Sequence, residues 1–365
     1  MQMRIGRDLA SILAKSWAQP RPGETNLSNE NLRTYFPLLS ETGTAALAWW
    51  LICPLKSSLT KEIVELYREA YVRSVAQTLV HERELASVVH ALNTSGIRSI
   101  LLKGWSVGRL YPESGLRPCG DIDLWVDPTQ QARAEEVVRR VASGRLPVDL
   151  EHDQFRRFET RSFADFYACS ETAYLGSAPV QVLRREEQIR ILCLHFLKHG
   201  GWRPIWLCDI AVLLDRGNEA FNWQLCLGND PRRARWIGST IALARDLLAA
   251  RIPDGAPPSV TSSPPKWFKR TVLQEWSDPR PPRVAALAAL LPALRLRPWQ
   301  INAVMRGRWR NSIQATVDCD GAFDALPRWF YQVKDAASRA LHFGREWAAL
   351  HHRHLPNRSE LLDRN

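Results

Sequence analysis

The stretch Cys119–Val126, which reads CGDIDLWV, decides the fold because it combines a strand pattern with two acids. Asp121 and Asp123 are two residues apart, and side chains at this spacing point to the same face of a sheet. Their Cα atoms are expected roughly 6–7 Å apart. Two such carboxylates can converge on a pair of divalent cations about 3.5–4 Å apart, the arrangement used for phosphoryl and nucleotidyl transfer. The stretch therefore predicts a buried strand that carries a metal site.

The segments around this strand predict a small mixed sheet with helices. A short buried strand is expected at residues 97–102, and two more are expected at 147–152 and 179–183. The pair Asp127-Pro128 predicts a helix start, because aspartate is a favoured N-cap and proline is favoured at the first helical position. The fold class that follows is α/β (α+β), with a compact sheet flanked by large helical regions at both ends.

The same patterns predict three regions along the chain. Residues 1–95 follow a helical period and form an N-terminal helical region, residues 96–185 form the catalytic core, and residues 186–365 form a C-terminal helical region. The last region is interrupted at 253–265, where five prolines predict a loop or hinge. No internal repeat is present.

Composition indicates a globular protein of one large or two modest domains. The chain has 365 residues, of which 45% are hydrophobic and 24% are charged. Its formal net charge of +11 is consistent with phosphate-bearing partners. A nucleic-acid partner is not favoured, because an arginine-rich composition alone gives the same balance.

Cysteine spacing and apolar run lengths predict a cytoplasmic protein with no membrane span. The seven cysteines are scattered and never spaced as C-x-x-C, so reduced thiols are expected rather than disulfides or structural zinc. The apolar runs at 44–55 and 284–294 are shorter than the roughly 18 residues that a membrane helix needs. The N-terminus lacks a signal-peptide core.

A second chemical element precedes the acids. Lys103-Gly104-Trp105-Ser106 opens a helix directly after a strand, and free backbone N–H groups at a helix start attract phosphate. Lys103 and the Ser106 hydroxyl could add contacts to such a phosphate. Arg117, in the loop before the acids, could neutralise a triphosphate. Lys103, Gly104, Ser106 and Arg117 are therefore the predicted nucleotide-binding residues.

A third carboxylate is expected on the next strand. Asp149 and Glu151 alternate on one face of the predicted strand at 147–152. A third acid beside the pair can ligate a second metal ion or take the proton from an attacking hydroxyl. Position favours Asp149 as the third ligand, and Glu151 stays a candidate.

This order of elements resembles the nucleotidyltransferase superfamily, and more closely an uncharacterised bacterial nucleotidyltransferase family with an LKG…GDID signature. The similar segments are Leu102–Gly104, Leu110–Pro112, Arg117, Gly120–Asp123, Asp149–His152, Leu194–His199 and Cys208–Ala211. Two positions depart from the pattern. Trp105 stands where the superfamily has a second small residue, and Glu151 stands where the close family tends to have histidine.

The resemblance implies an enzyme that transfers a nucleoside monophosphate from a nucleoside triphosphate such as ATP to an acceptor. It implies Mg²⁺ in a two-metal site, with Mn²⁺ as the alternative. The acceptor is not identified by the sequence, and a small molecule, a peptide or natural-product precursor and a protein are all open. Two alternatives remain, a non-catalytic accessory protein on the same fold and a kinase-like phosphoryl transferase.

Later polar residues on the helices have a weaker chemical signal. His195 and His199 are four apart on a predicted helix and could share a metal with Asp209, but no H-E-x-x-H pattern is present. We therefore favour His195, Lys198, His199 and Asp209 as residues that support the wall of a cleft.

Overall fold

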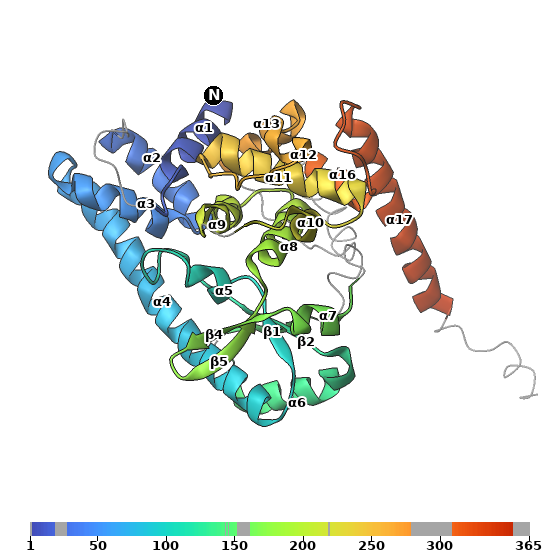
Figure 1. Ribbon diagram of the computed structural model, residues 1–365. Helices are drawn as coiled ribbons and strands as arrows, with labels where there is room; N and C mark the ends of the chain where they lie inside the picture. Colours follow the sequence, from blue (N-terminus) through green and yellow to red (C-terminus); the bar gives the residue numbers. More distant parts are fainter. Residues whose placement is uncertain are drawn as a thin grey trace, which may run out of the picture. The chain divides into compact units, whose positions relative to one another are not determined.

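The computed structural model describes residues 2–18, 28–142, 144, 146–151, 161–217, 220–278 and 309–352. The chain divides into two compact units (Figure 1). The first unit comprises Met1–Phe196 and Gly201–Pro279, and the second comprises Leu197–Gly200 and Arg280–Asn365. The two units are described separately. The predicted division at residues 95 and 185 stays a prediction.

The first unit contains a five-stranded mixed sheet with the strand order β3-β2-β1-β5-β4. Its strands are β1 (Ser99–Leu101), β2 (Ile122–Val126), β3 (Val148–Glu151), β4 (Glu171–Leu175) and β5 (Ala178–Val182). Strand β2 is antiparallel to β1 and parallel to β3. Strand β5 is parallel to β1 and antiparallel to β4. The mixed sheet that the sequence predicts is therefore confirmed.

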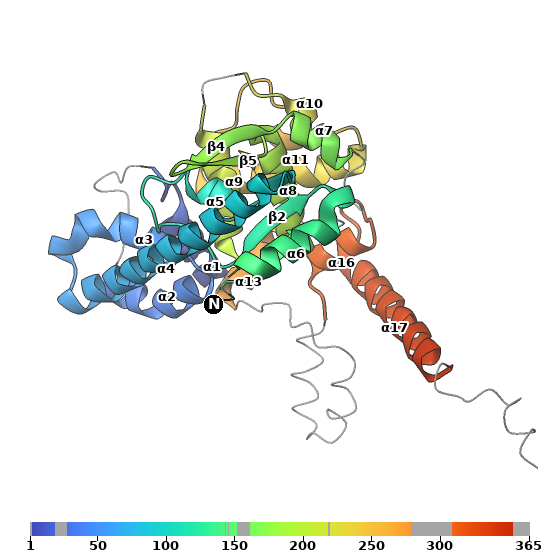
Figure 2. The ribbon, with the colours of Figure 1, turned by 90° about the horizontal axis from the view of Figure 1, so that it is seen from below.

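One face of the sheet is covered by two helices. Alternate strand residues such as Leu101, Leu124 and Val182 pack into a core with α4 (Lys61–Thr94) and α6 (Gln131–Val141). Figure 2 shows α4 and α6 lying over this face. Because side chains alternate along a strand, the neighbouring residues must point to the other face.

The second face carries both a smaller apolar core and the acids. Ile100 and Trp125 are register partners on β1 and β2 and pack with Phe166 of α7 (Phe163–Ala168). The rings of Trp125 and Phe166 lie 5.0 Å apart. Asp123 lies two residues before Trp125 and so shares this face. The aromatic core thus fills one part of the face and leaves the acids beside it.

The other helices of the first unit build two groups. The N-terminal group is α1 (Gln2–Leu13), α2 (Asn29–Glu41), α3 (Ala45–Ile52), the 3₁₀ turn η1 (Cys53–Ser58) and α4. The later group is α8 (Arg185–Lys198), α9 (Pro204–Asp215), α10 (Trp223–Leu227), α11 (Pro231–Leu248), α12 (Pro258–Thr261) and α13 (Lys266–Ser277). Helix α8 begins in the first unit, and its last residues belong to the second. Helix α1 joins the two groups because it packs against α13 and α11 as well as α3.

In the second unit the structure describes residues 197–200 and 309–352. Helices α16 (Ser312–Asp318) and α17 (Arg328–His352) pack on each other. Asn311 caps α16 and also donates from its side chain to the carbonyl of Gly200, over 2.8 Å. Arg310 pairs with Asp318 and Asp335. The described part of this unit is therefore largely helical, and polar contacts of Asn311 stabilise the first turn of α16.

Several predicted elements differ in detail. Strand β4 and helix α7 were not expected, and the helix predicted at Asp127-Pro128 begins as the short 3₁₀ turn η2 (Pro128–Gln130), with Asp127 as its N-cap. The predicted loop at 253–265 contains α12, because Pro258 occupies the first turn of a helix, where proline's missing N–H costs nothing. The apolar run at 284–294 lies outside the described residues.

Two other predictions concern thiols and membranes. All seven cysteines are free, as their spacing predicts. Within the described ranges, no helix combines the length and the apolar character needed to cross a membrane.

Candidate active site

Three carboxylates converge at the ends of β2 and β3. Asp123 and Asp149 are direct register partners on these parallel strands, and Asp121 lies just before β2. One oxygen from each of Asp121, Asp123 and Asp149 lies within 4.8 Å of the other two. Three carboxylate oxygens this close form a donor set that suits a hard divalent cation. The sequence predicts Asp121 and Asp123 on one face with Asp149 as the favoured third acid, and the strand pairing brings the three together.

The three acids differ in exposure. Asp123 is 5% exposed, whereas Asp121 and Asp149 are open to solvent. Burial raises the pKa of Asp123, and the charges of Asp121 and Asp149 raise this pKa further, while Lys103 opposes both effects. The site therefore has one buried acid at its base and two exposed acids at its mouth.

Lys103 neutralises the buried acid. Its Nζ lies 2.9 Å from Oδ1 of Asp123, and both side chains are almost fully buried. The backbone N–H of Leu102 donates to the carbonyl of Asp123, which fixes the two strands at this point. Lys103 and Gly104 both have positive φ, and Gly104 is the N-cap of the four-residue helix α5 (Trp105–Gly108). This tight turn brings the ammonium group back over the acids.

His81 of α4 holds the backbone of the site. Its Nε2 lies 2.8 Å from the carbonyl oxygen of Asp121, and the side chain is completely buried. Since a carbonyl only accepts, Nε2 carries the proton and donates. Burial lowers the pKa of His81, which favours the neutral ring. No residue in the described ranges bonds to Nδ1.

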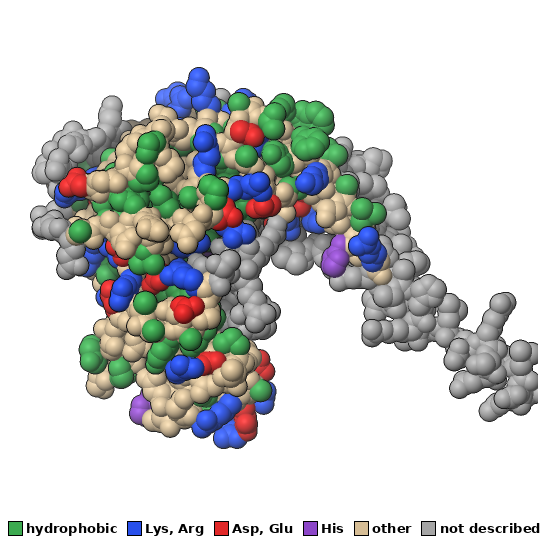
Figure 3. All heavy atoms as spheres, turned by 45° about the vertical axis from the view of Figure 1, so that its right-hand side comes forward, with side chains coloured by type: hydrophobic (Ala, Val, Ile, Leu, Met, Phe, Trp, Pro, Cys, Tyr) green, Lys and Arg blue, Asp and Glu red, His purple; other side chains and the backbone are tan. Residues whose placement is uncertain are grey.

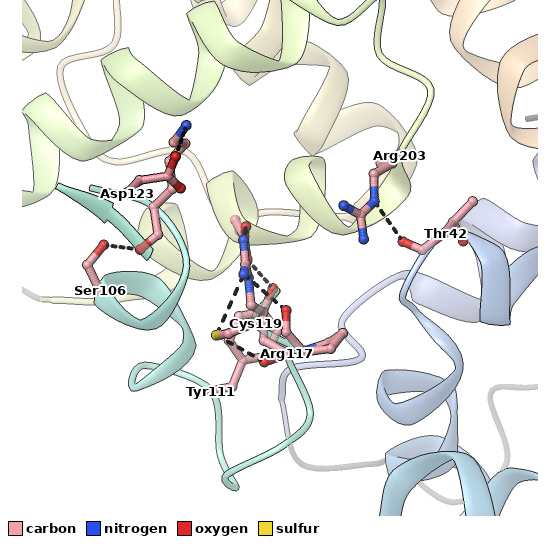
Figure 4. A network of polar contacts seen from close by, with 10 residues as sticks. Thr42, Ser106, Tyr111, Arg117, Cys119, Asp123 and Arg203 are labelled. Carbon is pink, nitrogen blue, oxygen red and sulfur yellow. Dashed lines mark hydrogen bonds and ion pairs between the residues drawn. The ribbon is translucent and has the colours of Figure 1, made fainter. Parts of the chain in front are cut away.

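Arg117 and Asp209 form a buried ion pair (Figure 4). Arg117 Nη2 lies 2.9 Å from Asp209 Oδ2, and the Tyr111 hydroxyl donates to Asp209 Oδ1 over 2.9 Å. Asp209 is on α9, whereas Tyr111 and Arg117 flank the loop that leads to the acids. The pKa of Arg117 lies above its ordinary value, because the attraction of Asp209 outweighs the opposing effect of burial. This cluster fastens the loop to α9.

The same loop is anchored to α4. Gly115 has a φ of +85°, and a Cβ at this position would lie 2.5 Å from a side-chain carbon of Val75. The hydroxyl of Ser74 donates to the carbonyl of Gly115 over 2.6 Å. Glycine is needed here both for the backbone conformation and for the close approach.

Part of the chain is similar to a known family. Residues 28–142 match the family model described as "Uncharacterised nucleotidyltransferase". The resemblance inferred from the sequence is thereby confirmed. The matched nucleotidyltransferase segment includes Lys103, Arg117, Asp121 and Asp123, and it ends before Asp149.

One solved structure is also similar. It is the crystal structure of an antigenic nucleotidyltransferase-like protein from Paracoccidioides brasiliensis, with 13% sequence identity and a TM-score of 0.34. The similarity covers 50% of this chain and 97% of that chain. None of the curated proteins compared with the chain matches it. The structure itself shows the small mixed sheet with flanking helices that the sequence predicts.

The structure also places the other residues that the sequence predicts for the site, and their roles stay predictions. Ser106 is buried and its hydroxyl donates to the carbonyl of Lys103 over 2.7 Å. Its contact with a phosphate stays a prediction, as does that of Arg117, and the burial of both side chains weighs against it. Glu151 lies two residues beyond Asp149 on β3, and its side chain lies outside the described residues.

The predicted wall residues separate between the two units. His195 belongs to the first unit, and its ring packs edge-on against Trp206, with 4.7 Å between the centroids. Lys198 and His199 belong to the second unit. Asp209 pairs with Arg117 of the loop that leads to the acids, and its supporting role stays a prediction. His81 was not predicted as a site residue, because no short motif marks it and it reaches the acid loop only through the fold.

Proposed function

We propose that this protein is a metal-dependent nucleotidyltransferase that moves a nucleoside monophosphate from a nucleoside triphosphate to an acceptor. The observation that carries the proposal is the convergence of Asp121, Asp123 and Asp149. Two of these acids, Asp121 and Asp123, lie in the segment that matches an uncharacterised nucleotidyltransferase family. Carboxylate triads on adjacent strands suit the charge distribution of this reaction, in which the protein mainly positions the reactants and neutralises charge.

The donor set fits Mg²⁺, with Mn²⁺ as the alternative. All three potential ligands are carboxylates, and hard cations of this kind prefer oxygen. Asp121 and Asp123 would hold the cations, and Asp149 would complete the second position. When bound, divalent cations neutralise charge on the phosphates and support an in-line displacement.

The chain's own residues would perform the following steps. The acceptor oxygen forms a bond to the α-phosphorus, and the bond from this phosphorus to the β-bridging oxygen breaks, so that pyrophosphate leaves. The acceptor proton passes to the exposed carboxylate of Asp149 or to Glu151, which lies two residues farther along β3. Lys103 keeps Asp123 ionised and in place at the base of the site. His81 fixes the backbone of Asp121.

The test combines metal binding with product analysis. Purified protein would be titrated with Mn²⁺ and followed by electron paramagnetic resonance, then incubated with Mg²⁺ and each α-labelled triphosphate while acceptors are screened. We expect Asp121→Asn and Asp149→Asn to weaken Mn²⁺ binding and to abolish label transfer. The matched control is Glu69→Gln, which removes an exposed acid on α4.

Two results would overturn the proposal. One is label transfer at the normal rate in the Asp121→Asn/Asp149→Asn double variant. The other is a nucleoside diphosphate as the second product instead of pyrophosphate, because a kinase-like transfer releases the diphosphate. Absence of Mn²⁺ and nucleotide binding in the native protein would favour the accessory-protein alternative.

A further inference from the structure

Arg203, the N-cap residue of α9, is a cation that has no acidic partner among the residues that the structure describes. Its Nε donates to the carbonyl of Thr42 over 3.4 Å. Across the described residues, no carboxylate pairs with Arg203, and neither of its Nη atoms has an acceptor. A guanidinium has five N–H donors, so most of its hydrogen-bonding capacity is unused.

Two indole rings hold the guanidinium in place. Arg203 Cζ lies 5.5 Å from the centroid of Trp202 and 5.4 Å from that of Trp206. The rings of Trp202 and Trp206 are themselves packed edge-on at 5.7 Å. Contacts of a cation with aromatic faces at this range are attractive and fix the orientation of the side chain. The indole Nε1 of Trp202 is also buried with no acceptor in the described part of the chain.

The guanidinium and the loop that leads to the acids both lie close to Gly43. Arg203 Nη2 and Pro118 Cγ lie 2.8 Å and 3.5 Å from the position that a Cβ at Gly43 would occupy. Pro118 is three residues before Asp121 in the chain. Figure 4 shows Arg203 at the start of α9, in the same view as Asp123 and the Arg117 cluster.

Electrostatics agree with this placement. Burial lowers the pKa of Arg203 and the charge of Arg117 lowers it further, while Asp209 and Asp121 oppose this shift. Lys103 and Arg117 pair with buried carboxylates, whereas the described residues offer Arg203 no carboxylate.

We propose that Arg203 binds the polyphosphate of the nucleoside triphosphate, held for this contact by Trp202 and Trp206. The planar fork of a guanidinium matches two phosphate oxygens, and a preorganised fork loses little entropy on binding. The β- and γ-phosphates extend beyond the reacting α-phosphorus, where a further cation can neutralise part of their charge. This inference rests on the proposed function for the identity of the ligand.

The experiment measures binding of inorganic tripolyphosphate by calorimetry, with a chelator present so that no metal takes part. Arg203→Gln should weaken the binding by about tenfold or more, because hydrogen bonds to a charged group are lost. The affinity of Arg203→Lys for tripolyphosphate should lie between those of the native protein and of Arg203→Gln. Lysine keeps the positive charge but lacks the planar group that binds two oxygens. The matched control is Arg270→Gln, which removes an exposed arginine on α13 and should change the affinity by less than about twofold.

Two outcomes would overturn the inference. One is an Arg203→Gln variant that binds tripolyphosphate as tightly as the native protein, and the other is a native protein that does not bind it. Circular dichroism and thermal unfolding check that the variants fold. If Arg203→Gln does not fold, unchanged affinity in Arg203→Lys overturns the inference instead.

A second ligand distinguishes the two substrates that could supply the phosphate, which are the nucleoside triphosphate and a phosphorylated acceptor. Glucose 6-phosphate carries a single phosphomonoester, and tighter binding of this probe than of tripolyphosphate would assign Arg203 to the acceptor and overturn the nucleotide assignment. Because the assay needs neither metal nor catalysis, its result is independent of label transfer. Loss of the proposed function would leave an Arg203-dependent phosphate site intact, and the reverse also holds.

Discussion

Asp123 differs from Asp121 and Asp149 in burial, so the three acids should respond differently to neutralisation. Asp123→Asn removes the carboxylate that pairs with the buried ammonium of Lys103, and breaking a buried pair in this way costs about 3 kcal/mol or more. Asp121→Asn and Asp149→Asn remove exposed like charges and should change the free energy of unfolding by less than about 0.5 kcal/mol. Urea unfolding of metal-free protein measures both effects.

Metal binding supplies the complementary measurement for the same variants. All three substitutions should weaken Mn²⁺ binding, although only Asp123→Asn should lower stability. The Glu69→Gln control should match the native protein in Mn²⁺ affinity and in the free energy of unfolding. Equal stability losses in all three aspartate variants would contradict the difference in burial.

At this scale the sequence predicts part of the site. Asp121 and Asp123 follow from strand alternation, which needs only local spacing. Asp149 is predicted as the favoured third acid, whereas the register that sets it opposite Asp123 is a property of the folded sheet. His81 comes from a helix far from the acids in the sequence, so no local pattern could bring it to the acid loop.

Among the elements, the loop before β2 depends on one buried ion pair. Asp209→Asn removes the partner of Arg117 on α9, and we expect a loss of about 3–5 kcal/mol in the free energy of unfolding. The loop should also loosen, so Mn²⁺ affinity should fall although Asp209 is not a ligand. Chemical denaturation and Mn²⁺ titration check this prediction.

An exposed ion pair is the matched control for this experiment. Glu136 and Arg140 pair on the surface of α6, four residues apart. Glu136→Gln should cost no more than about 0.5 kcal/mol, because solvent screens such pairs. Similar losses for the two ion pairs would show that the Arg117–Asp209 contact does not fasten the loop.

Helix α11 offers a prediction about pH. Asp230 caps this helix and accepts from the backbone N–H groups of Arg232 and Arg233. The hydrogen bond from Arg233 is the main cause that lowers the pKa of Asp230, and burial opposes it only in part. Asp230→Ala should therefore cost about 1 kcal/mol at neutral pH.

The sign of the pH dependence follows from this lowered pKa. The folded protein holds the Asp230 proton less tightly than the unfolded chain, so the stabilisation is complete above the pKa of an unfolded aspartate. It is lost as the pH falls through the lower pKa of the folded state. The difference between native and Asp230→Ala unfolding curves should thus shrink toward zero in strong acid, and a constant difference would contradict this.

Element prediction succeeded where the local pattern was long or had a cap. Helix α4 and the cap at Asp127 were expected, whereas β4 and α7 were missed. Strand β4 exposes both Glu171 and Thr172, so it lacks the apolar alternation that marks a half-buried strand. Its place in the sheet comes from pairing with β5.

For the whole molecule, the net charge of +11 predicts that polyphosphate binding weakens with salt. Figure 3 shows Lys and Arg side chains interspersed with acidic and apolar ones on the face in view. Because charges of both signs are mixed on this face, we expect the affinity for tripolyphosphate to fall only gradually as the salt concentration rises. Tripolyphosphate affinity should fall by roughly threefold to tenfold between low and physiological salt, since the Debye length is then about 8 Å. A much steeper fall would indicate an extended polyanion surface.

The register between Asp123 and Asp149 has a consequence for the divergence of related chains. The two strands are joined by η2, α6 and a connecting segment, none of which supplies a described ligand. Insertions or deletions there would leave the acids together as long as the strands pair in the same register, whereas a slip of one residue would turn Asp149 to the opposite face. Distant relatives should therefore conserve the alternation within each strand and vary freely in the number of residues between them.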